Sequence, residues 1–291
     1  MTHTDWSEQF DAPAPQAAAT QAAPADVLNP FLQHGIQHLS NSHLNSFIDD
    51  RGMWALNYLA GKRTPANVNM IRGTTAELGV EFGLKHPDKP VEDAIAYALE
   101  AFDKQTALIA NQLGKQKARE EMPGFVGNAL QALKPLGEPE FLDPESGRQH
   151  RIELNLDGIA VPVIGYLDFF YPNQGLIVDL KTTARMPTTD KKTGKLKMSD
   201  AHSRQGAIYS AAHGNMGVKF LYVTPKKSGF ADLEDAQHHL QMVGHIAARL
   251  QAYLELTTDT TKLIEASCPN FDGWKWNDPQ AVLLRQEVFG I

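Results

Sequence analysis

Two aspartates and a lysine stand in two neighbouring apolar segments, at a spacing that could support metal chemistry. Asp168 ends the first segment, and Asp179 and Lys181 alternate with apolar residues in the second. Charged groups are costly to bury without partners, and two converging carboxylates repel each other unless a divalent cation joins them. Mg²⁺ prefers such oxygen ligands. A nearby lysine could then orient or deprotonate a water molecule and stabilise charge on a phosphate, as phosphodiester hydrolysis requires.

These side chains can meet only if both segments are β-strands joined by a short turn. Alternate side chains of a strand share a face, so Asp179 and Lys181 point the same way. A turn at residues 173–175 would bring Asp168 beside Asp179. An Asp-x-Lys sequence alone is also typical of an exposed ion pair on a half-solvated strand, and this alternative stays open for the pair taken by itself.

The rest of the chain predicts an α/β fold with a helical first half. The predicted helices cover residues 41–59, 66–84, 91–111, 117–133 (interrupted near Pro123), 200–213 and 233–256. The predicted strands cover residues 151–156, 161–171, 176–183 and 218–223. The first three strands follow one another closely and predict an antiparallel meander. We therefore expect a small mixed central sheet flanked by helices, as in restriction-endonuclease-like cores.

Composition is that of an ordinary globular protein. The 291 residues are 42% hydrophobic and 21% charged, and no apolar run reaches the length of a membrane helix. The single cysteine, Cys268, excludes an internal disulfide and a multi-cysteine metal or iron–sulfur site within one chain. No secretory signal is evident, so we expect a cytoplasmic protein with no membrane partner.

The first 28 residues differ from the rest in composition. They are rich in Ala, Pro and Gln and hold four acidic residues with no Lys or Arg, which predicts a disordered tail before a single domain over 29–291. Removing these four negative charges from the net charge of −7 leaves −3. An acidic balance argues against a sequence-reading DNA-binding protein more than against an enzyme that gathers carboxylates for metal.

Four motifs in order, over about residues 39–225, resemble those of one nuclease superfamily. The central motif is Gly-x-x-Asp at 165–168 followed by Asp-x-Lys-Thr at 179–182. The others are Leu-Ser-Asn-Ser-His-Leu-Asn-Ser-Phe at 39–47, Arg-Gly-Thr-Thr-Ala-Glu at 72–77 and Gln-Gly-Ala-Ile-Tyr at 205–209. Together they resemble the RecB-like branch of the PD-(D/E)XK nucleases.

The resemblance implies roles for particular residues. It implies that Asp168, Asp179, Glu77 and the main-chain carbonyl of Leu180 bind Mg²⁺ or Mn²⁺, and that Lys181 positions the attacking water. Gln205 and Tyr209, four residues apart on a predicted helix, would contact DNA or support the lysine. Relatives often have His where this chain has Glu77, and Glu81 lies one turn later as an alternative ligand. Relatives with an iron–sulfur cluster have four cysteines, which this chain lacks.

Basic and hydroxyl side chains near these motifs could contact the DNA backbone. The loop that follows the 176–183 strand, residues 185–197, is rich in lysine. Its lysines could contact DNA, or the loop could simply be solvated. Arg72 could hold a phosphate or form an ion pair with a nearby carboxylate. The candidate DNA-contacting or supporting residues are Arg72, Thr182, Arg185, Lys191, Lys192, Lys195, Lys197, Arg204, Gln205 and Tyr209.

We expect a metal-dependent deoxyribonuclease. By resemblance, the preferred form is an exonuclease acting in recombination or repair, in a bacterial cell or a phage-infected host, with a possible partner protein. The alternatives are a catalytically silent DNA-binding or assembly subunit on the same fold and a structure-specific endonuclease. Trp274 and Trp276, near the C-terminal end, could stack on an unpaired base or, as we favour, close a core.

Overall fold

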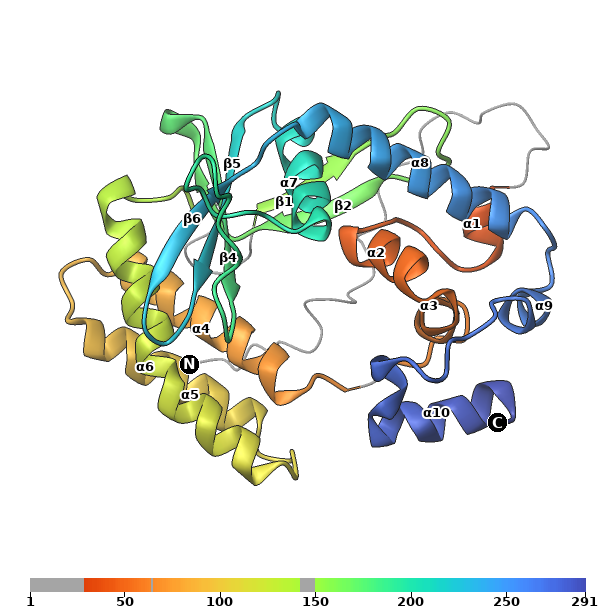
Figure 1. The fold of residues 1–291 in the computed structure, drawn as a ribbon, viewed down its shortest axis with the longest axis horizontal. Coiled ribbons are helices and arrows are strands. Elements are labelled where there is room, and N and C mark those ends of the chain that lie inside the picture. The colour runs from red at the N-terminus through yellow and green to blue at the C-terminus, as the bar shows by residue number, and fades with distance from the viewer. Residues whose placement is uncertain (1–28, 64, 142–149) are drawn as a thin grey trace, which may run out of the picture.

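A mixed β-sheet of four strands lies at the centre of the computed structural model, which describes residues 29–63, 65–141 and 150–291 (Figure 1). The strand order is β3 (Phe169–Tyr171), β4 (Leu176–Thr182), β5 (Gly217–Val223), β6 (Ser228–Asp232). β4 runs parallel to β5, and the two outer pairs are antiparallel. The predicted α/β class with a small mixed sheet is confirmed. The tail predicted over 1–28 lies outside the described residues.

A second sheet pairs β1 (His150–Leu154) with β2 (Val163–Leu167) in antiparallel register. The strand predicted over 161–171 is therefore two strands in different sheets, separated at Asp168. The Oδ2 of Asp168 accepts a hydrogen bond from the Leu180 N–H at 2.7 Å. At this point a side-chain oxygen accepts the hydrogen bond that a backbone carbonyl of a continuous strand would accept. The expected three-stranded meander is therefore divided between two sheets.

Helices α4, α5 and α6 pack on one face of the central sheet (Figure 1). Their bounds are Val68–Lys85, Val91–Gln105 and Gln112–Leu133. They form a core with the strand residues Val178, Leu180, Leu221 and Val223. α6 continues through Pro123, where an interruption was expected. Met122 and Phe125 beside it are buried, so tertiary packing holds the turn that proline weakens.

Helices α7 (Asp200–Ala212) and α8 (Ala236–Leu254) lie on the other face, together with the N-terminal helices. Ile177 of β4, Val218 and Phe220 of β5 and Ile208 of α7 share this second core. The sequence did not predict β6. Its residues Ser-Gly-Phe-Ala-Asp carry a weak strand pattern, and the segment becomes a strand through its ladder with β5.

The N-terminal helices are α1 (Pro30–Gln33), α2 (Asn41–Asp49) and α3 (Arg51–Tyr58). The single helix predicted over 41–59 is therefore broken at Asp50, whose backbone is extended (φ −158°, ψ 99°). Its carboxylate accepts hydrogen bonds from the Met53 N–H at 3.0 Å and from the Trp276 Nε1–H at 2.7 Å. Asp50 caps α3 and ties it to the C-terminal segment, which explains the break.

The C-terminal segment closes a third core against α3. Its helices are α9 (Thr260–Glu265), η4 (Trp274–Asn277) and α10 (Pro279–Phe289). Elsewhere in the chain there are two short 3-10 turns, η2 (Lys134–Leu136) and η3 (Pro172–Gln174). Trp276 is 1% exposed beside Met53 and Leu56, so it closes a core as favoured and is not free to stack on a base. The side chain of Trp274 lies outside the described part of the chain. Within the described ranges, no helix is both long and apolar enough to span a membrane.

Candidate active site

β4 presents Asp179 and Lys181 on the face that α7 covers. The parallel register places Asp179 opposite Phe220 and Lys181 opposite Tyr222 of β5. Lys181 Nζ lies 2.5 Å from Asp179 Oδ1, and the two side chains are 27% and 1% exposed. Asp179 is thus buried, and the pair is not the exposed, half-solvated ion pair that its spacing alone allowed.

Asp168 reaches the same place from the break between β2 and β3. Its carboxylate accepts a hydrogen bond from the N–H of Leu180, so it lies beside the residue between Asp179 and Lys181. Burial raises the pKa of Asp168 well above its usual value, and the charges of Glu77 and Asp179 raise it further, against the opposing effect of Lys181. The acids therefore gather more negative charge than one lysine offsets.

Glu77 is brought to this cluster by α4, which approaches the end of β4 closely. A Cβ on Gly73 of α4 would lie 3.4 Å from Thr182 Oγ1. The charge of Glu77 acts on both Asp168 and Lys181. Glu81, the alternative third carboxylate, instead forms an ion pair with Lys85 on its own helix. Glu77, whose charge acts on Asp168 and Lys181, is therefore the better candidate than Glu81 for the third carboxylate.

Lys181 is protonated in this arrangement. Burial lowers the pKa of Lys181, but the carboxylates of Asp179, Asp168 and Glu77 outweigh this effect and hold the pKa above its ordinary value. Burial raises the pKa of Asp179, and Lys181 opposes the shift. An ammonium group can hold a water molecule or an anionic oxygen, whereas it cannot accept a proton. In the metal-free site Lys181 is therefore suited to orient water. A bound divalent cation would lower its pKa, so both roles, orienting and deprotonating water, stay predictions.

Gln205 and Tyr209 lie on one face of α7 and form a chain of hydrogen bonds to Asp179. Gln205 Nε2 donates to Asp179 Oδ2 at 2.9 Å and to the Tyr209 hydroxyl at 2.7 Å. The Tyr209 hydroxyl donates to the Tyr166 carbonyl on β2 at 2.8 Å. Both residues thus support a candidate metal ligand, which differs from the two roles expected for them, contact with DNA or support of the lysine.

Close packing explains why the Gly-x-x-Asp motif has glycine at position 165. A Cβ at Gly165 would lie 2.8 Å from Tyr209 Cε1 and 3.3 Å from the Ile152 side chain. Contacts below 3.0 Å force a neighbour to move, so glycine at position 165 allows the close approach of the Tyr209 ring to β2. Gly165 and Tyr209 therefore pack directly against each other, although they are 44 positions apart along the chain.

The donor set suits a hard divalent cation. Asp179 Oδ1 is buried and accepts no hydrogen bond within the described residues, and its contact is the ion pair with Lys181. In that part of the chain, no three His, Cys, Asp or Glu side chains are grouped closely enough to hold an ion as they stand. Carboxylates with raised pKa values are groups that a cation would relieve. Asp168, Asp179 and Glu77 would hold it, and the ligand role of the Leu180 carbonyl stays a prediction.

Two arginines predicted to contact DNA are engaged inside the protein. Arg72 is buried, and its Nη1 lies 3.8 Å from Glu121 Oε2, so it forms the ion pair that was its alternative role. Arg204 Nε and Nη2 donate to Asn45 Oδ1 at 2.8 and 2.6 Å. Asn45 belongs to the opening motif at 39–47, so Arg204 joins α7 to α2.

The lysine-rich loop is exposed and partly paired. Lys197 Nζ lies 3.4 Å from Asp190, and Lys195 Nζ lies 3.7 Å from Asp232. Part of the loop charge is thus balanced locally. Among the described residues of this loop, the exposed cations with no ion pair are Arg185, Lys191 and Lys192. These three are the cations of the loop best placed to meet a phosphate backbone.

Sequence reasoning missed three residues that surround Lys181. The Phe220 ring lies 5.4 Å from Lys181 Nζ, and the His202 ring stacks on Phe220 with centroids 5.2 Å apart. His202 Nδ1 lies 2.6 Å from the Tyr222 hydroxyl. The helical spacing of His202 three residues before Gln205 was a usable signal. Phe220 and Tyr222 gave none, because only the register of β5 against β4 brings them here.

Comparison with known proteins adds little. No protein-family profile and no curated protein matches this sequence. One solved structure, described as the crystal structure of SSO0001, is similar at 13% sequence identity and a TM-score of 0.30, and the match covers 69% of this chain and 85% of that chain. A likeness of this size says nothing about function, which must come from the residues themselves.

Proposed function

We propose that this protein is a Mg²⁺- or Mn²⁺-dependent deoxyribonuclease of the PD-(D/E)XK superfamily. The observation that carries the proposal is the buried Asp179–Lys181 ion pair beside Asp168, which is bonded to the Leu180 N–H. The charge of Glu77 acts on Asp168 and Lys181, and the pKa values of both aspartates are raised. These residues come from α4, the β2–β3 break and β4. A cluster of buried acids with one ammonium needs a cation to be stable at neutral pH, and phosphodiester hydrolysis uses these groups.

Each residue of the cluster has a distinct task in this proposal. A bound metal ion would polarise the phosphate and activate water. Asp168, Asp179 and Glu77 would hold the ion, and Gln205 fixes Asp179 Oδ2 by a hydrogen bond from α7. The Lys181 ammonium holds the attacking water and then the developing negative charge on phosphate oxygen. The water oxygen bonds to phosphorus, its proton passes to solvent, and the bond to the leaving sugar oxygen breaks.

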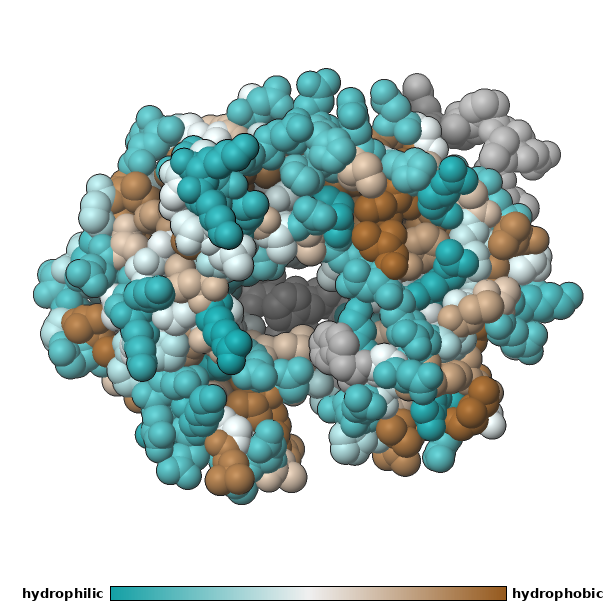
Figure 2. Space-filling model, viewed as in Figure 1, coloured by the Kyte–Doolittle hydropathy of each residue, from teal (hydrophilic) through white to brown (hydrophobic). Residues whose placement is uncertain are grey.

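The finer assignment rests on the RecB-like motifs. We propose an exonuclease acting on duplex ends in recombination or repair, in the cytoplasm of a bacterial or phage-infected cell, with a partner protein to deliver DNA. The space-filling view is hollowed between α4 and α2, and hydrophilic residues cover much of the rim (Figure 2). A strand entering this hollow would approach β4, with the exposed Arg185, Lys191 and Lys192 available to its phosphates.

Cleavage of end-labelled linear duplex and closed circular DNA tests the proposal, in Mg²⁺, in Mn²⁺ and in EDTA. We expect linear DNA to be degraded only with metal, while circles survive. Asp179→Asn and Lys181→Ala should each reduce cleavage on the order of a thousand-fold, about 4 kcal/mol of barrier. The matched exposed variants Asp157→Asn and Lys226→Ala should cut as the wild type does. Absence of cleavage by folded wild-type protein with either metal would contradict the nuclease assignment, and cutting of circles would replace exonuclease by endonuclease.

A further inference from the structure

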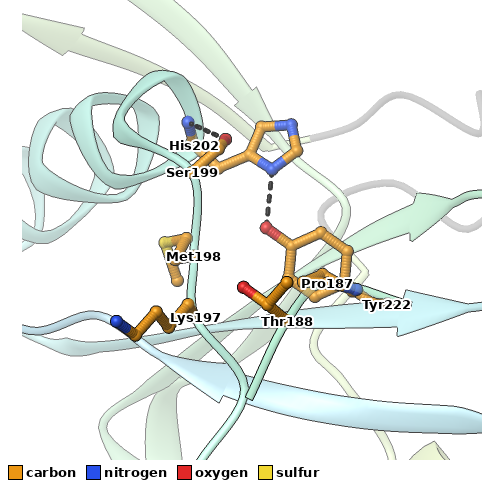
Figure 3. Close-up of a pocket in the computed structure, with 7 residues that line it drawn as sticks. All are labelled: Pro187, Thr188, Lys197, Met198, Ser199, His202 and Tyr222. Atoms are coloured by element: carbon orange, nitrogen blue, oxygen red, sulfur yellow. Dashed lines mark hydrogen bonds between the residues drawn. The ribbon is translucent and has the colours of Figure 1, made fainter. Parts of the chain in front are cut away.

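A pocket of about 470 Å³ lies next to Lys181 and belongs to none of the motifs (Figure 3). Its lining residues are Pro187, Thr188, Lys197, Met198, Ser199, His202 and Tyr222. Five of them come from the loop between β4 and α7, one from α7 and one from β5. The volume is that of a site for a small molecule or for one unit of a polymer.

The loop that forms the pocket wall is held in place. Residues on its two sides pair through the Lys197 N–H and the Thr188 carbonyl at 2.8 Å. A Cβ on Gly229 of β6 would lie 2.8 Å from a Leu196 methyl and 3.2 Å from Met186, so the loop lies directly on the strand. The pocket is therefore a built feature, with a wall fixed to the central sheet.

The pocket shares its floor with the surroundings of Lys181. Tyr222 lies opposite Lys181 across the β4–β5 ladder. His202 points at the Tyr222 hydroxyl (Figure 3), and its ring stacks on the same Phe220 ring that Lys181 approaches. A ligand in this pocket would thus sit next to a phosphate held at Lys181.

The chemistry of the lining suits an uncharged, flat group with polar edges. Burial and then the Lys181 charge lower the pKa of His202 to about 4, so its ring is neutral at neutral pH. None of the seven described lining residues is acidic. Pro187 and Met198 offer apolar surface, and Thr188 and Ser199 offer hydroxyls. A nucleobase is bound by this combination of apolar contact with its faces and hydrogen bonds to its edges.

We propose that this pocket binds the unpaired nucleobase of the nucleotide next to the scissile phosphate. The proposal rests on the proposed nuclease function and names the substrate class of the same site: DNA with an unpaired nucleotide at the point of cutting. Lys197, exposed at the rim beside Asp190, would contact the phosphate on the far side of that nucleotide. Cleavage of a paired end then requires the last base pair to open first.

The test uses duplexes with a short unpaired end, with and without a base at the nucleotide next to the cut. We expect wild-type protein to cut the substrate that lacks this base about tenfold more slowly, through a higher KM. Met198→Ala and Tyr222→Phe should lose the difference between the two substrates. Lys226→Ala, on the surface outside the pocket, should keep it. If His202 and Tyr222 served only to position Lys181, Tyr222→Phe would lower kcat equally for both substrates.

A binding measurement separates failure of this proposal from failure of the nuclease assignment. Oligonucleotides with 2-aminopurine at the unpaired position are titrated with protein in Ca²⁺, where binding is read by fluorescence without cleavage. We expect a fluorescence change that Met198→Ala reduces at least about fivefold. Equal cutting with and without the base, together with a fluorescence change that Met198→Ala leaves unaltered, would overturn the pocket proposal and leave the nuclease standing. Neither cutting nor binding by folded protein would overturn both.

Discussion

The two faces of β4 are both largely covered by helices and are opposite in character. Toward α4–α6, Val178 and Leu180 pack among apolar side chains with no polar partner to satisfy. Toward α7, Asp179 and Lys181 lie among hydrogen bonds, ion pairs and aromatic rings. Burial stabilises the first face through the hydrophobic effect, whereas on the second it raises the free energy of the charged carboxylates. One strand thus supplies both a folding core and a site whose groups are poised for a cation.

The largest expected contrast comes from neighbouring positions on β5 and β4. Leu221, fully buried opposite Leu180, faces the apolar core. Leu221→Ala should lower the free energy of unfolding by about 2 to 5 kcal/mol and leave cleavage by the folded fraction intact. Lys181→Ala should lose cleavage even in its folded fraction, and it should also lower stability because it leaves the buried Asp179 without its counter-charge. Urea denaturation and initial rates measure both. Loss of activity in a well-folded Leu221→Ala protein would mean that the two faces are not separate.

A second contrast concerns pH and metal. The folded pKa values of Asp168 and Asp179 are raised, so their contribution to stability is complete below the unfolded pKa of about 3.9 and is lost as pH rises through the folded values. Buried His43 and His202, whose pKa values are lowered, change stability in the opposite direction as pH rises, so the aspartates are assessed by the difference between two proteins. We expect Asp168→Asn to gain stability relative to metal-free wild type as pH rises from about 4. A divalent cation at a hundred times its Kd should restore about 2.7 kcal/mol, mainly at the higher pH.

Thermal unfolding between pH 4 and 8, with EDTA or with Mg²⁺, measures this dependence of stability on pH and metal. Asp157→Asn, an exposed acid, serves as the control and should keep the wild-type slope. An Asp168→Asn protein that gains no stability relative to metal-free wild type as pH rises, or one that Mg²⁺ stabilises as much as the wild type, would contradict the assignment of these carboxylates.

The smallest effect expected is at Gly165. A methyl group there would push the Tyr209 ring, which lies 2.8 Å from the added Cβ, and loosen the hydrogen bond from Gln205 to Asp179. Gly165→Ala should cost about 1 to 3 kcal/mol of stability and reduce cleavage about tenfold by the loss of about 1.4 kcal/mol. Gly244→Ala adds the same methyl on α8, where nothing lies within 4 Å, and should be neutral or stabilising. Equal behaviour of the two variants would remove Tyr209 from the support of Asp179.

Local patterns in the sequence determined much of this protein. Period-two alternation placed Asp179 and Lys181 on one face of a strand, and four-residue spacing placed Gln205 and Tyr209 on one face of a helix. Both are properties of the backbone geometry of single elements, so they need no knowledge of the partners. The mixed sheet with helices, and most of the element positions, followed from the same periodicities.

Tertiary structure decided what depends on partners far apart in the chain. It broke the second predicted strand at Asp168, because the Leu180 N–H offered that carboxylate a hydrogen bond. It favoured Glu77 over Glu81, because the charge of Glu77 acts on Asp168 whereas Glu81 forms an ion pair with Lys85. It paired Arg72 with Glu121.

The pocket beside Lys181 was likewise invisible in the sequence. His202 and Tyr222 are 20 positions apart and become neighbours only through the packing of α7 on β5. A local pattern sets which face a side chain occupies, whereas its neighbours across space follow from strand register and helix packing, which no short stretch of sequence encodes.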